Sequence, residues 1–329
     1  MKVSIALCTY NGEKYLSEQL ESLLKQTRPA DEIVICDDQS KDGTEQVVKD
    51  FEDKLPIRFY KNESSLRVVK NFEKAANLCT GDIIFFCDQD DVWEKDKIQV
   101  MLDVFSKNDS LELLFSNAEL VNGELEPLEK DLWQSVRFWK QQQADFQQKK
   151  EVDILLQGNR VTGCTMAVKR SLIEQVTPFP ENVHPTFIHD YWLAIVAAHK
   201  GTIGIIDRKL VKYRQHASQY VGIAANNQEP IRFLDRFSRP REVKIAPFKD
   251  KVRYFTTLEE KLISIGVTNT EKLKAIAEFY EKRATLPEKK LNRVLPASQL
   301  LLSGMYHRYK DLEANSFAPF LAFLGDILE

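Results

Sequence analysis

Residues 1–115 alternate short apolar runs with amphipathic segments, and this alternation constrains the fold more than any other feature of the chain. The apolar runs are bounded by polar or turn residues, as buried parallel strands are; they read VSIALC, EIVICDD, IRFY, DIIFFCDQ and LELLFSN. Between them, apolar residues recur at helical spacing, as in the series Leu16, Leu20, Leu23 and Leu24. Strand–helix–strand alternation of this kind predicts an α/β fold, with a mainly parallel sheet flanked by helices.

Polar residues follow three of these apolar runs directly. TYNG follows the first run, DDQSKDG follows the second and DQDD follows the fourth. In parallel α/β sheets, ligands bind in the crevice outside the carboxyl ends of the strands. If the runs are parallel strands, the three polar clusters meet at one edge of the sheet. The sequence therefore predicts a binding site built from residues 9–12, 37–43 and 88–91.

Three carboxylates, those of Asp88, Asp90 and Asp91, stand directly after the apolar run IIFFC. Like charges held this close cost energy unless protonation, a basic partner or a divalent cation neutralises them. A hard cation such as Mg²⁺ or Mn²⁺ takes oxygen ligands and shares its coordination with substrate phosphates. This chemistry favours a site for a metal and a diphosphate. The alternative is that the aspartates are solvated and that Asp91 caps a helix formed by WEKDKIQVMLDVF.

The motifs TYNGEKYL, DDQSKDGT, FFCDQDDVW, HDYWLAIVAA and LVKYRQH, in this order, resemble family 2 glycosyltransferases of the GT-A fold. The likeness covers about residues 1–220, and CDQDDVW, HDYW and YRQH are most similar to bacterial rhamnosyltransferases that build polysaccharide from dTDP-rhamnose. The resemblance implies a Rossmann-like GT-A catalytic domain over residues 1–222 and inverting, metal-dependent transfer of a sugar from a nucleotide donor. The late motif is YRQH rather than the Q-x-x-R-W of processive polysaccharide synthases, which opposes a polymerase.

The resemblance also implies roles for individual residues. Asp190 matches the catalytic base, and Asp90, together with Asp88 and His216, is expected to hold Mg²⁺ or Mn²⁺. The residues expected to contact the nucleotide are Thr9, Tyr10, Asn11, Asp37, Asp38, Lys70 and Asp88, with Asp38 accepting a hydrogen bond from the pyrimidine N3–H. The residues expected near the acceptor or the diphosphate are Asp91, Trp93, His189, Trp192 and Arg214.

Residue chemistry alone leaves plainer roles open for several of these positions. Asp190 precedes the apolar segment LAIVAA and would also serve as the N-cap or a first-turn residue of that helix. His189 and Trp192 would also fit core positions, and His216 would fit a strand end where it bonds to a backbone carbonyl. Lys70 would fit a solvated helix start.

Composition narrows the class of protein and its partners. With 329 residues, 43% of them hydrophobic and 29% charged, the chain fits a soluble globular protein, and a net charge of −3 predicts no nucleic-acid binding. No apolar run approaches the roughly 18–20 residues needed to span a bilayer, and the apolar part of MKVSIALCTYNG is too short for a secretory signal. The five cysteines are scattered, with no C-x-x-C pair. We therefore expect a cytoplasmic protein without a disulfide framework or a zinc site.

The remaining segments follow a different pattern. Residues 125–160 are expected to form a helical or loop insertion near the substrate, and residues 223–329 are expected to form a helical appendage. The segment SRPREVKIAPFKDKVR is basic with apolar interruptions, and SFAPFLAFLGDILE is apolar. These features would allow peripheral contact at the inner face of the membrane, where the acceptor would be a glycan or a glycan on a polyprenyl diphosphate. The alternatives are packing on the catalytic domain and a homodimer.

Three other functions stay open at this point. One is transfer from a UDP-hexose or a UDP-N-acetylhexosamine on the same fold. Another is a sugar-phosphate nucleotidyltransferase, which needs a glycine-rich phosphate loop, whereas TYNGEKYL contains one glycine. The last is a non-catalytic carbohydrate-binding protein, which the presence of Asp88, Asp90 and Asp190 together opposes.

Overall fold

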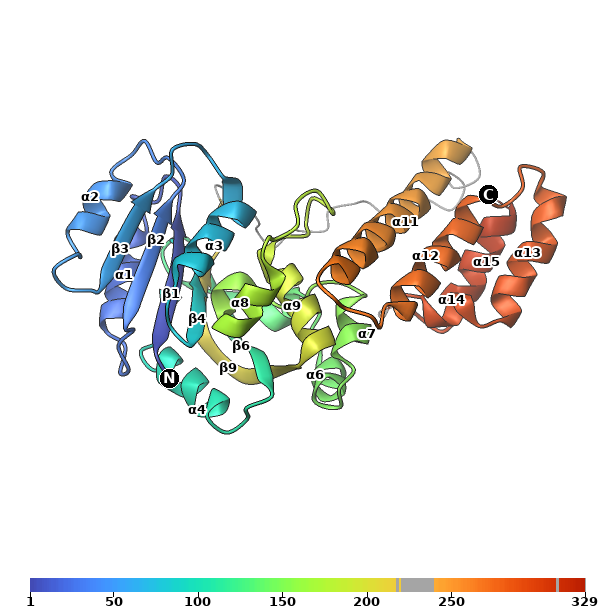
Figure 1. Ribbon diagram of the computed structural model, residues 1–329. Helices are drawn as coiled ribbons and strands as arrows, with labels where there is room; N and C mark the ends of the chain where they lie inside the picture. Colours follow the sequence, from blue (N-terminus) through green and yellow to red (C-terminus); the bar gives the residue numbers. More distant parts are fainter. Residues whose placement is uncertain (217–218, 220–239, 312–313, 329) are drawn as a thin grey trace. The chain divides into compact units, whose positions relative to one another are not determined.

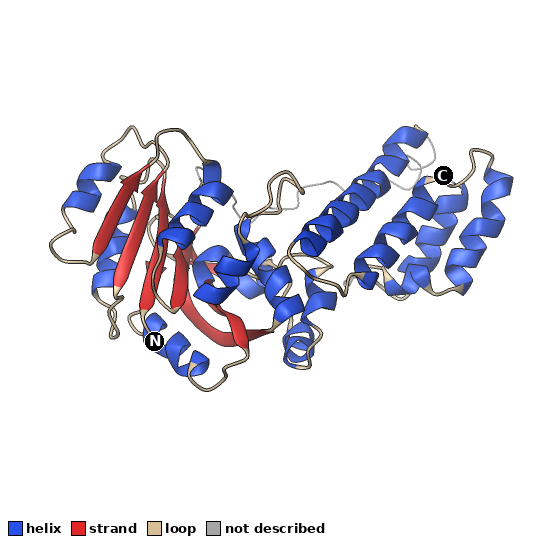
Figure 2. Ribbon diagram, viewed as in Figure 1, coloured by secondary structure: helices blue, strands red, loops and turns tan. Residues whose placement is uncertain are grey.

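The computed structural model describes residues 1–216, 219, 240–311 and 314–328 of the chain. The chain divides into two compact units, Met1–Ala224 and Ala225–Glu329. The first unit contains the sheet and the second is helical, as the ribbon in Figure 1 and the secondary-structure colours in Figure 2 show. The predicted boundary between residues 222 and 223 lies outside the described residues.

The first four strands form the parallel part of the sheet. They are β1 (Val3–Thr9), β2 (Glu32–Asp37), β3 (Ile57–Lys61) and β4 (Ile83–Cys87), in the order β3-β2-β1-β4. Every residue of β2 and β4 is buried, which explains why these strands read as continuous apolar runs. Thr9 of β1 pairs with Asp37 of β2, and Leu7 pairs with Cys87 of β4. This register brings the polar residues after the three strands to one edge of the sheet, as predicted.

Three helices connect these strands. They are α1 (Leu16–Leu24), α2 (Thr44–Lys49) and α3 (Arg67–Leu78). The leucines of α1 and the Phe72 face of α3 are buried, in agreement with their helical spacing in the sequence. Because crossovers between parallel strands are right-handed, α1 and α2 cover one face of the sheet, and α3, which leads back to β4, covers the other (Figure 1).

The sheet continues beyond β4 with strands of mixed direction. The further strands are β5 (Val92–Trp93), β6 (Leu111–Val121), β7 (Pro127–Asp131), β8 (Met166–Lys169) and β9 (Thr202–Arg214). β8 runs antiparallel between β4 and β6, whereas β9 is parallel to β6 and pairs antiparallel with β5. The sheet is therefore parallel in its first half and mixed in its second, because a strand from late in the chain inserts between β4 and β6.

Helix α9 (His189–Lys200) is the most deeply buried helix of the first unit. All its residues from His189 to Ala197 are buried, because the helix packs against α3, α8 (Arg170–Val176) and the strands β6 and β9. The part LAIVA of this helix is thus apolar all round because it has no solvent face. Helix α4 (Lys97–Phe105) packs against β6.

The segment predicted as an insertion is mainly helical. After β7 it forms α5 (Leu132–Ser135), α6 (Lys140–Gln147) and α7 (Glu151–Leu155). Trp133 and Phe146 of this segment each pack edge to face on Phe115 of β6, and Phe138 packs edge to face on both Trp133 and Phe146. This aromatic cluster fixes the segment on the sheet, so that Leu132, at the start of α5, lies beside the strand ends that carry the polar clusters.

The second unit is helical, as predicted. Its helices are α11 (Arg241–Ser264), α12 (Glu271–Ala284), α13 (Lys290–Leu302), α14 (Met305–Arg308) and α15 (Ala318–Leu328). Arg283 of α12 pairs with Asp326 of α15 at 2.6 Å, and Asp326 also accepts the Tyr306 hydroxyl at 2.5 Å. Residues 238–239, which begin the basic segment singled out above, lie outside the described residues.

Apolar side chains of α13 remain exposed. Leu291 and Leu302 are each 87% exposed and Leu295 is 70% exposed. The spacing of four and seven residues places these three leucines along one side of the helix. Among the described helices, none combines the length and the apolar character required to cross a bilayer.

Candidate active site

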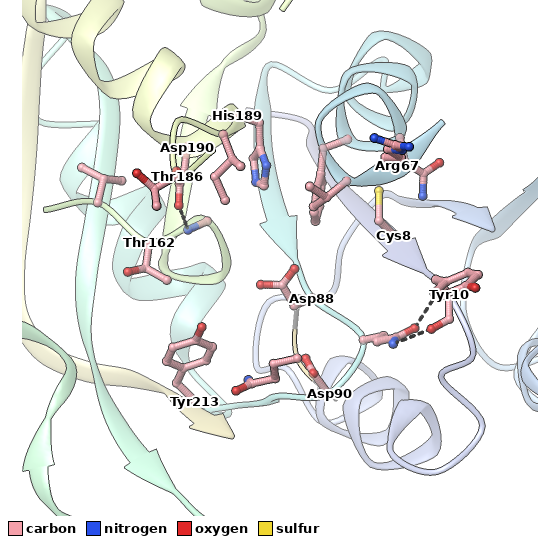
Figure 3. A pocket seen from close by; sticks show the side chains of 18 of the residues that line it. Cys8, Tyr10, Arg67, Asp88, Asp90, Thr162, Thr186, His189, Asp190 and Tyr213 are labelled. Carbon is pink, nitrogen blue, oxygen red and sulfur yellow. Dashed lines mark hydrogen bonds between the residues drawn. The ribbon is translucent and has the colours of Figure 1, made fainter. Parts of the chain in front are cut away.

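The polar strand ends meet at a pocket of about 590 Å³ (Figure 3). Its walls come mainly from residues 8–90 and 132–190. The predicted site residues that line it are Thr9, Tyr10, Asp38, Asp88, Asp90, His189 and Asp190. The predicted site residues outside this lining are Asn11, Asp37, Lys70, Asp91, Trp93, Trp192, Arg214 and His216.

Tyr10 forms the rim of the pocket and is 58% exposed, so that its ring is free to stack on a base. Its backbone N–H donates to Gln89 Oε1 at 2.8 Å, and Gln89 Nε2 donates to the Tyr10 carbonyl at 3.0 Å. The second residue of DQDD therefore holds the loop after β1. A Cβ at Gly12 would lie 2.3 Å from Gln89 Oε1, so a larger residue in TYNG would displace Gln89 from Tyr10.

Asp38 accepts four hydrogen bonds from the chain itself. The donors are the backbone N–H groups of Leu66 (2.6 Å) and Arg67 (2.9 Å) and the side chains of Asn62 (2.9 Å) and Ser65 (2.7 Å). Burial opposes ionisation of Asp38, but these hydrogen bonds outweigh burial and lower its pKa. An ionised carboxylate offers about four lone-pair sites. A pyrimidine N3–H can therefore bond Asp38 only if one of these donors moves.

Three other residues expected near the nucleotide do not line the pocket and have structural roles in the chain itself. Asp37 is fully buried and accepts the Thr9 hydroxyl at 2.8 Å. Lys70 Nζ forms an ion pair with Glu73 at 2.8 Å. Asn11 has a left-handed backbone, with φ 48°, in the turn after β1. These side chains shape the loops around the pocket.

Asp88 and Asp90 both lie in the pocket wall, whereas His216 lies outside the lining and contacts Asp90. His216 Nε2 lies 2.8 Å from Asp90 Oδ2, so the structure brings together two of the three residues that the sequence predicted at the metal. Burial, and then the neighbouring carboxylates of Asp90 and Asp190, raise the pKa of Asp88 to about 7. The cluster is repulsive as it stands, and a cation or a set of donors from a ligand would relieve it.

Arg214 contacts the buried side of the loop formed by DQDD and does not line the pocket. It is 1% exposed, its Nε donates to the Asp90 carbonyl at 2.7 Å, and its backbone N–H donates to Asp91 Oδ1 at 3.1 Å. Its guanidinium also pairs with Glu18 of α1 and lies 4.3 Å from the centre of the Tyr15 ring. Arg214 thus fixes the loop geometry, whereas the sequence predicted contact with the diphosphate or the acceptor.

A buried lysine lies close to the same loop, on its core side. Lys97 is fully buried, its Nζ donates to the Cys164 carbonyl at 2.6 Å, and it lies 3.6 Å from the centre of the Trp93 ring. Burial lowers the pKa of Lys97 to about 8, although the nearby Asp91 and Asp88 act in the opposite direction. Trp93 and Trp192, both predicted near the substrate, are buried in the core, where Trp192 Nε1 donates to a backbone carbonyl of α8.

Asp190 lies across the pocket from the DQDD loop, in the first turn of α9 (Figure 3). Its Oδ1 accepts Asn159 Nδ2 at 3.0 Å and the Tyr191 N–H at 2.5 Å, and its Oδ2 accepts the Gly163 N–H at 3.1 Å. Burial raises the pKa of Asp190 to about 7, and these three hydrogen bonds limit the rise. A carboxylate with a pKa near neutrality is matched to the work of a general base.

Residues 4–177 match the family described as Glycosyl transferase family 2. The chain belongs to this family. Family 2 relatives include an uncharacterised glycosyltransferase of Rickettsia prowazekii, RP339, which is 26% identical over 92% of this chain and 87% of its own. Another is the dTDP-rhamnosyl transferase RfbG of Shigella flexneri, 29% identical over 66% of this chain and 73% of its own. Membership establishes a glycosyltransferase and confirms the predicted family.

The fold of this glycosyltransferase also matches solved structures. The crystal structure of Staphylococcus aureus TarS residues 1–349 with UDP-GlcNAc superposes with a TM-score of 0.54, at 19% identity, and covers 94% of this chain and 88% of that one. The predicted GT-A fold, with a helical C-terminal region, is confirmed.

Enzymes of the GT-A fold commonly use a divalent cation, and the carboxylates of this glycosyltransferase suit one. Ligand atoms of Asp88, Asp91 and Cys164 lie within 4.8 Å of one another. Burial raises the pKa of the Cys164 thiol, and a hard cation prefers oxygen ligands to a protonated thiol. The inner cluster is therefore a poor site for Mg²⁺ or Mn²⁺. The pocket face of the loop offers two carboxylates, Asp88 and Asp90, with the imidazole of His216 beside them.

Four residues of this glycosyltransferase site were missed by sequence reasoning. Asn159 and Gly163 hold the carboxylate of Asp190, Gln89 holds the loop after β1, and Lys97 supports the DQDD loop. Gln89 could have been found, because it lies inside the DQDD motif. Asn159 and Gly163 carry no local signal, since their role depends on a helix about 30 residues later in the chain.

Asn159 gives a direct test of whether Asp190 acts as a general base. Removing its N–H with Asn159→Ala deletes one donor to Asp190 and should raise the Asp190 pKa further, by roughly one pH unit. Because a base must be deprotonated to act, the acidic limb of the kcat/KM profile should move to higher pH, with the rates converging at alkaline pH. Asn159→Asp, which adds a like charge, should move the limb further. If the acidic limb of the profile lies at the same pH in both variants as in the wild type, Asn159 does not influence the pKa that governs the reaction.

Proposed function

We propose that this chain catalyses inverting transfer of a sugar from a nucleotide sugar to a hydroxyl group of a glycan acceptor. The observation that supports it most directly is the arrangement in Figure 3, where Asp190, with a pKa raised to about 7, faces Asp88 and Asp90 across one pocket. One side of the pocket is suited to accept a proton and the other to bind a diphosphate. A single displacement at the anomeric carbon needs these two functions on opposite sides of the sugar.

In this mechanism the acceptor oxygen attacks the anomeric carbon while the bond from that carbon to the diphosphate oxygen breaks. The electron pair of the broken bond stays on the leaving nucleoside diphosphate, and Asp190 takes the acceptor proton. The N–H groups of Asn159 and Gly163 hold the Asp190 carboxylate in one orientation before the acceptor arrives. One displacement inverts the configuration at the anomeric carbon.

Asp90, Asp88 and His216 are the residues we assign to Mg²⁺ or Mn²⁺. A bound divalent cation would neutralise the negative charge of the diphosphate. Arg214 keeps the loop that carries Asp90 and Asp91 in place through its bonds to the Asp90 carbonyl and the Asp91 carboxylate. On the nucleotide side, Tyr10 at the rim is placed to stack on the base.

The donor we favour is dTDP-rhamnose, and the setting is cell-surface polysaccharide synthesis. The similarity to the Shigella flexneri dTDP-rhamnosyl transferase supports this choice. An Escherichia coli UDP-Glc:alpha-D-GlcNAc-diphosphoundecaprenol beta-1,3-glucosyltransferase, WfgD, is 32% identical over 36% of this chain and 47% of its own. UDP-glucose and UDP-N-acetylhexosamines are therefore the alternative donors, and a polyprenyl-diphosphate-linked glycan is the acceptor we propose.

The proposal is tested by calorimetric titration of the wild-type protein with dTDP-rhamnose, UDP-glucose and UDP-GlcNAc, each with and without Mn²⁺. We expect one donor to bind clearly more tightly than the others, and only when the metal is present. That donor is then incubated with candidate acceptors, and the product configuration is read by NMR. Failure of every nucleotide sugar and every free nucleotide to bind would overturn the proposed function.

We extend the proposal to peripheral membrane contact through the exposed leucines of α13, at the inner face of the membrane. Vesicles with anionic lipid at low salt should co-sediment with the wild type, and Leu295→Glu with Leu302→Glu should weaken this binding. Leu24→Glu, which changes an exposed leucine of α1, serves as the matched control. If the wild type does not bind vesicles but forms a dimer that the α13 variant dissociates, the leucines belong to a homodimer instead.

A further inference from the structure

His189 is a buried polar residue in the pocket wall whose surroundings are almost entirely apolar. It is the first residue of α9 and is 3% exposed. Its ring stacks on Phe72 of α3, with centroids 4.1 Å apart and planes inclined by 28°. Phe86 of β4 lies parallel to it within 14°, at 5.5 Å. These two aromatic rings fix the imidazole in one orientation in the pocket (Figure 3).

Neither ring nitrogen of His189 has a hydrogen-bond partner in the part of the chain that the structure describes. Nε2 faces Gly163, where a Cβ would lie only 2.8 Å away. Any side chain at residue 163 would therefore collide with this nitrogen, and Gly163 has no side chain that could pair with it. A buried polar group left unpaired is destabilising because it has lost its hydrogen bonds to water. A group that enters the pocket and pairs with this ring would remove this destabilisation.

The chemistry of the ring restricts which group can do so. Burial lowers the pKa of His189 to about 3, so the imidazole is neutral near pH 7. A neutral imidazole has one N–H donor and one acceptor nitrogen. A hydroxyl group matches it, because a hydroxyl both donates and accepts, whereas a phosphate oxygen only accepts. The ring carries no charge with which to balance a diphosphate.

The position of the ring indicates which hydroxyl group it can bond. His189 adjoins the base Asp190 in the chain, and its ring packs on β4, which leads into Asp88. On the proposed function, on which this inference rests, the sugar being transferred occupies the space between those two carboxylates. We propose that the ring of His189 hydrogen-bonds a hydroxyl group of the donor sugar and so forms a sugar-recognition subsite at the inner wall of the pocket.

The test compares nucleotide sugars with their own nucleotides. His189→Phe keeps a stacking ring and removes both nitrogens. Titrations with dTDP, dTDP-rhamnose, UDP and UDP-glucose, all with Mn²⁺, should show unchanged affinity for the free nucleotide. Affinity for the sugar nucleotide that the wild type selects should fall about fivefold or more. His189→Asn, whose amide both donates and accepts, should recover part of this loss.

Deoxy-sugar donors identify the hydroxyl itself. With the donor that lacks the bonded hydroxyl, the affinity of the wild type should fall by the same factor as the His189→Phe substitution causes with the full donor. With that deoxy donor, His189→Phe should bind no more weakly than the wild type. Additive losses at every deoxy position would overturn the inference. So would an equal loss for nucleotide and nucleotide sugar, or no loss for either, because these outcomes assign the ring to the nucleotide or to a structural water.

Two controls keep the outcome interpretable. His199→Phe makes the same change in the last turn of α9, outside the pocket lining, and should leave both affinities unchanged. Thermal unfolding of each variant reports whether it folds, and if His189→Phe does not, the comparison rests on His189→Asn, which should still discriminate between donors with and without the hydroxyl. A wild type that binds free nucleotides but shows no gain from the sugar overturns this subsite alone, whereas one that binds no nucleotide overturns the proposed function.

Discussion

Replacing Asp190 with asparagine should reduce sugar transfer by about 10²–10⁴-fold while donor affinity stays within a factor of a few. The amide cannot take the acceptor proton, yet it has nearly the same shape as the carboxylate. Both oxygens of Asp190 accept N–H groups in the wild type, so the new NH₂ will face one donor. At the Oδ1 position Asn159 can turn its own amide, but the Tyr191 N–H still faces the new NH₂, and at the Oδ2 position the NH₂ faces the Gly163 N–H. Single-turnover transfer and calorimetric titration of the same preparation measure the two quantities separately.

Asp103→Asn is the matched control for this change. Asp103 is an exposed carboxylate of α4 outside the pocket lining, and its substitution should alter neither transfer nor binding. If Asp190→Asn transfers sugar at a rate near that of the wild type, Asp190 is not the base. In that case the N-cap or first-turn role left open by the sequence accounts for its position on α9.

Replacing Asp90 with alanine should abolish the metal dependence of nucleotide binding, with a loss of roughly 10–100-fold in metal affinity. Asp90 supplies a pocket-facing carboxylate beside His216, and Asp88 alone offers too few oxygen ligands to hold a hard cation tightly. The substitution also removes a negative charge whose repulsion raises the pKa of Asp88. The Asp88 pKa should therefore fall in this variant. Titration of Mn²⁺ in the presence of the selected nucleotide measures the effect.

Asp53→Ala removes an exposed carboxylate far from the DQDD loop in the sequence and should leave Mn²⁺ affinity unchanged. Unaltered Mn²⁺ affinity in Asp90→Ala would count against the site at the pocket face. Metal binding that depended instead on Asp91 and Cys164 would point to the inner cluster.

The parallel half of the sheet was predictable because its strands are buried on both faces. Such strands carry a continuous apolar run, which EIVICDD and DIIFFCDQ show plainly, and the polar residues after them mark the carboxyl ends. The second half was harder to predict. β8 is four residues long and is inserted between two strands that precede it in the sequence. The direction of β8 depends on the distant strands with which it pairs, and the local sequence pattern carries no information on that pairing.

The site residues that could be predicted are those that directly follow the end of a strand. Asp88 and Asp90 lie in the pocket for this reason. Trp192 and Arg214 were assigned to the substrate because their side chains suit it, but the same side chains also serve burial and loop support. Lys97 is the clearest case. A lysine at a helix start is ordinarily solvated, and only the packing of Trp93 and the Cys164 carbonyl around it explains its burial.

The two walls of the pocket come from separate stretches of the chain, residues 8–90 and 132–190. The first carries Asp38, Asp88 and Asp90, and the second carries Asp190 with Asn159 and Gly163, which hydrogen-bond it. The two stretches interlock where they meet, because the ring of His189 from the second stacks on Phe72 and Phe86 from the first. A substitution at either phenylalanine would therefore also shift the wall that carries Asp190. Selection for one substrate would then restrict the residues available for the other.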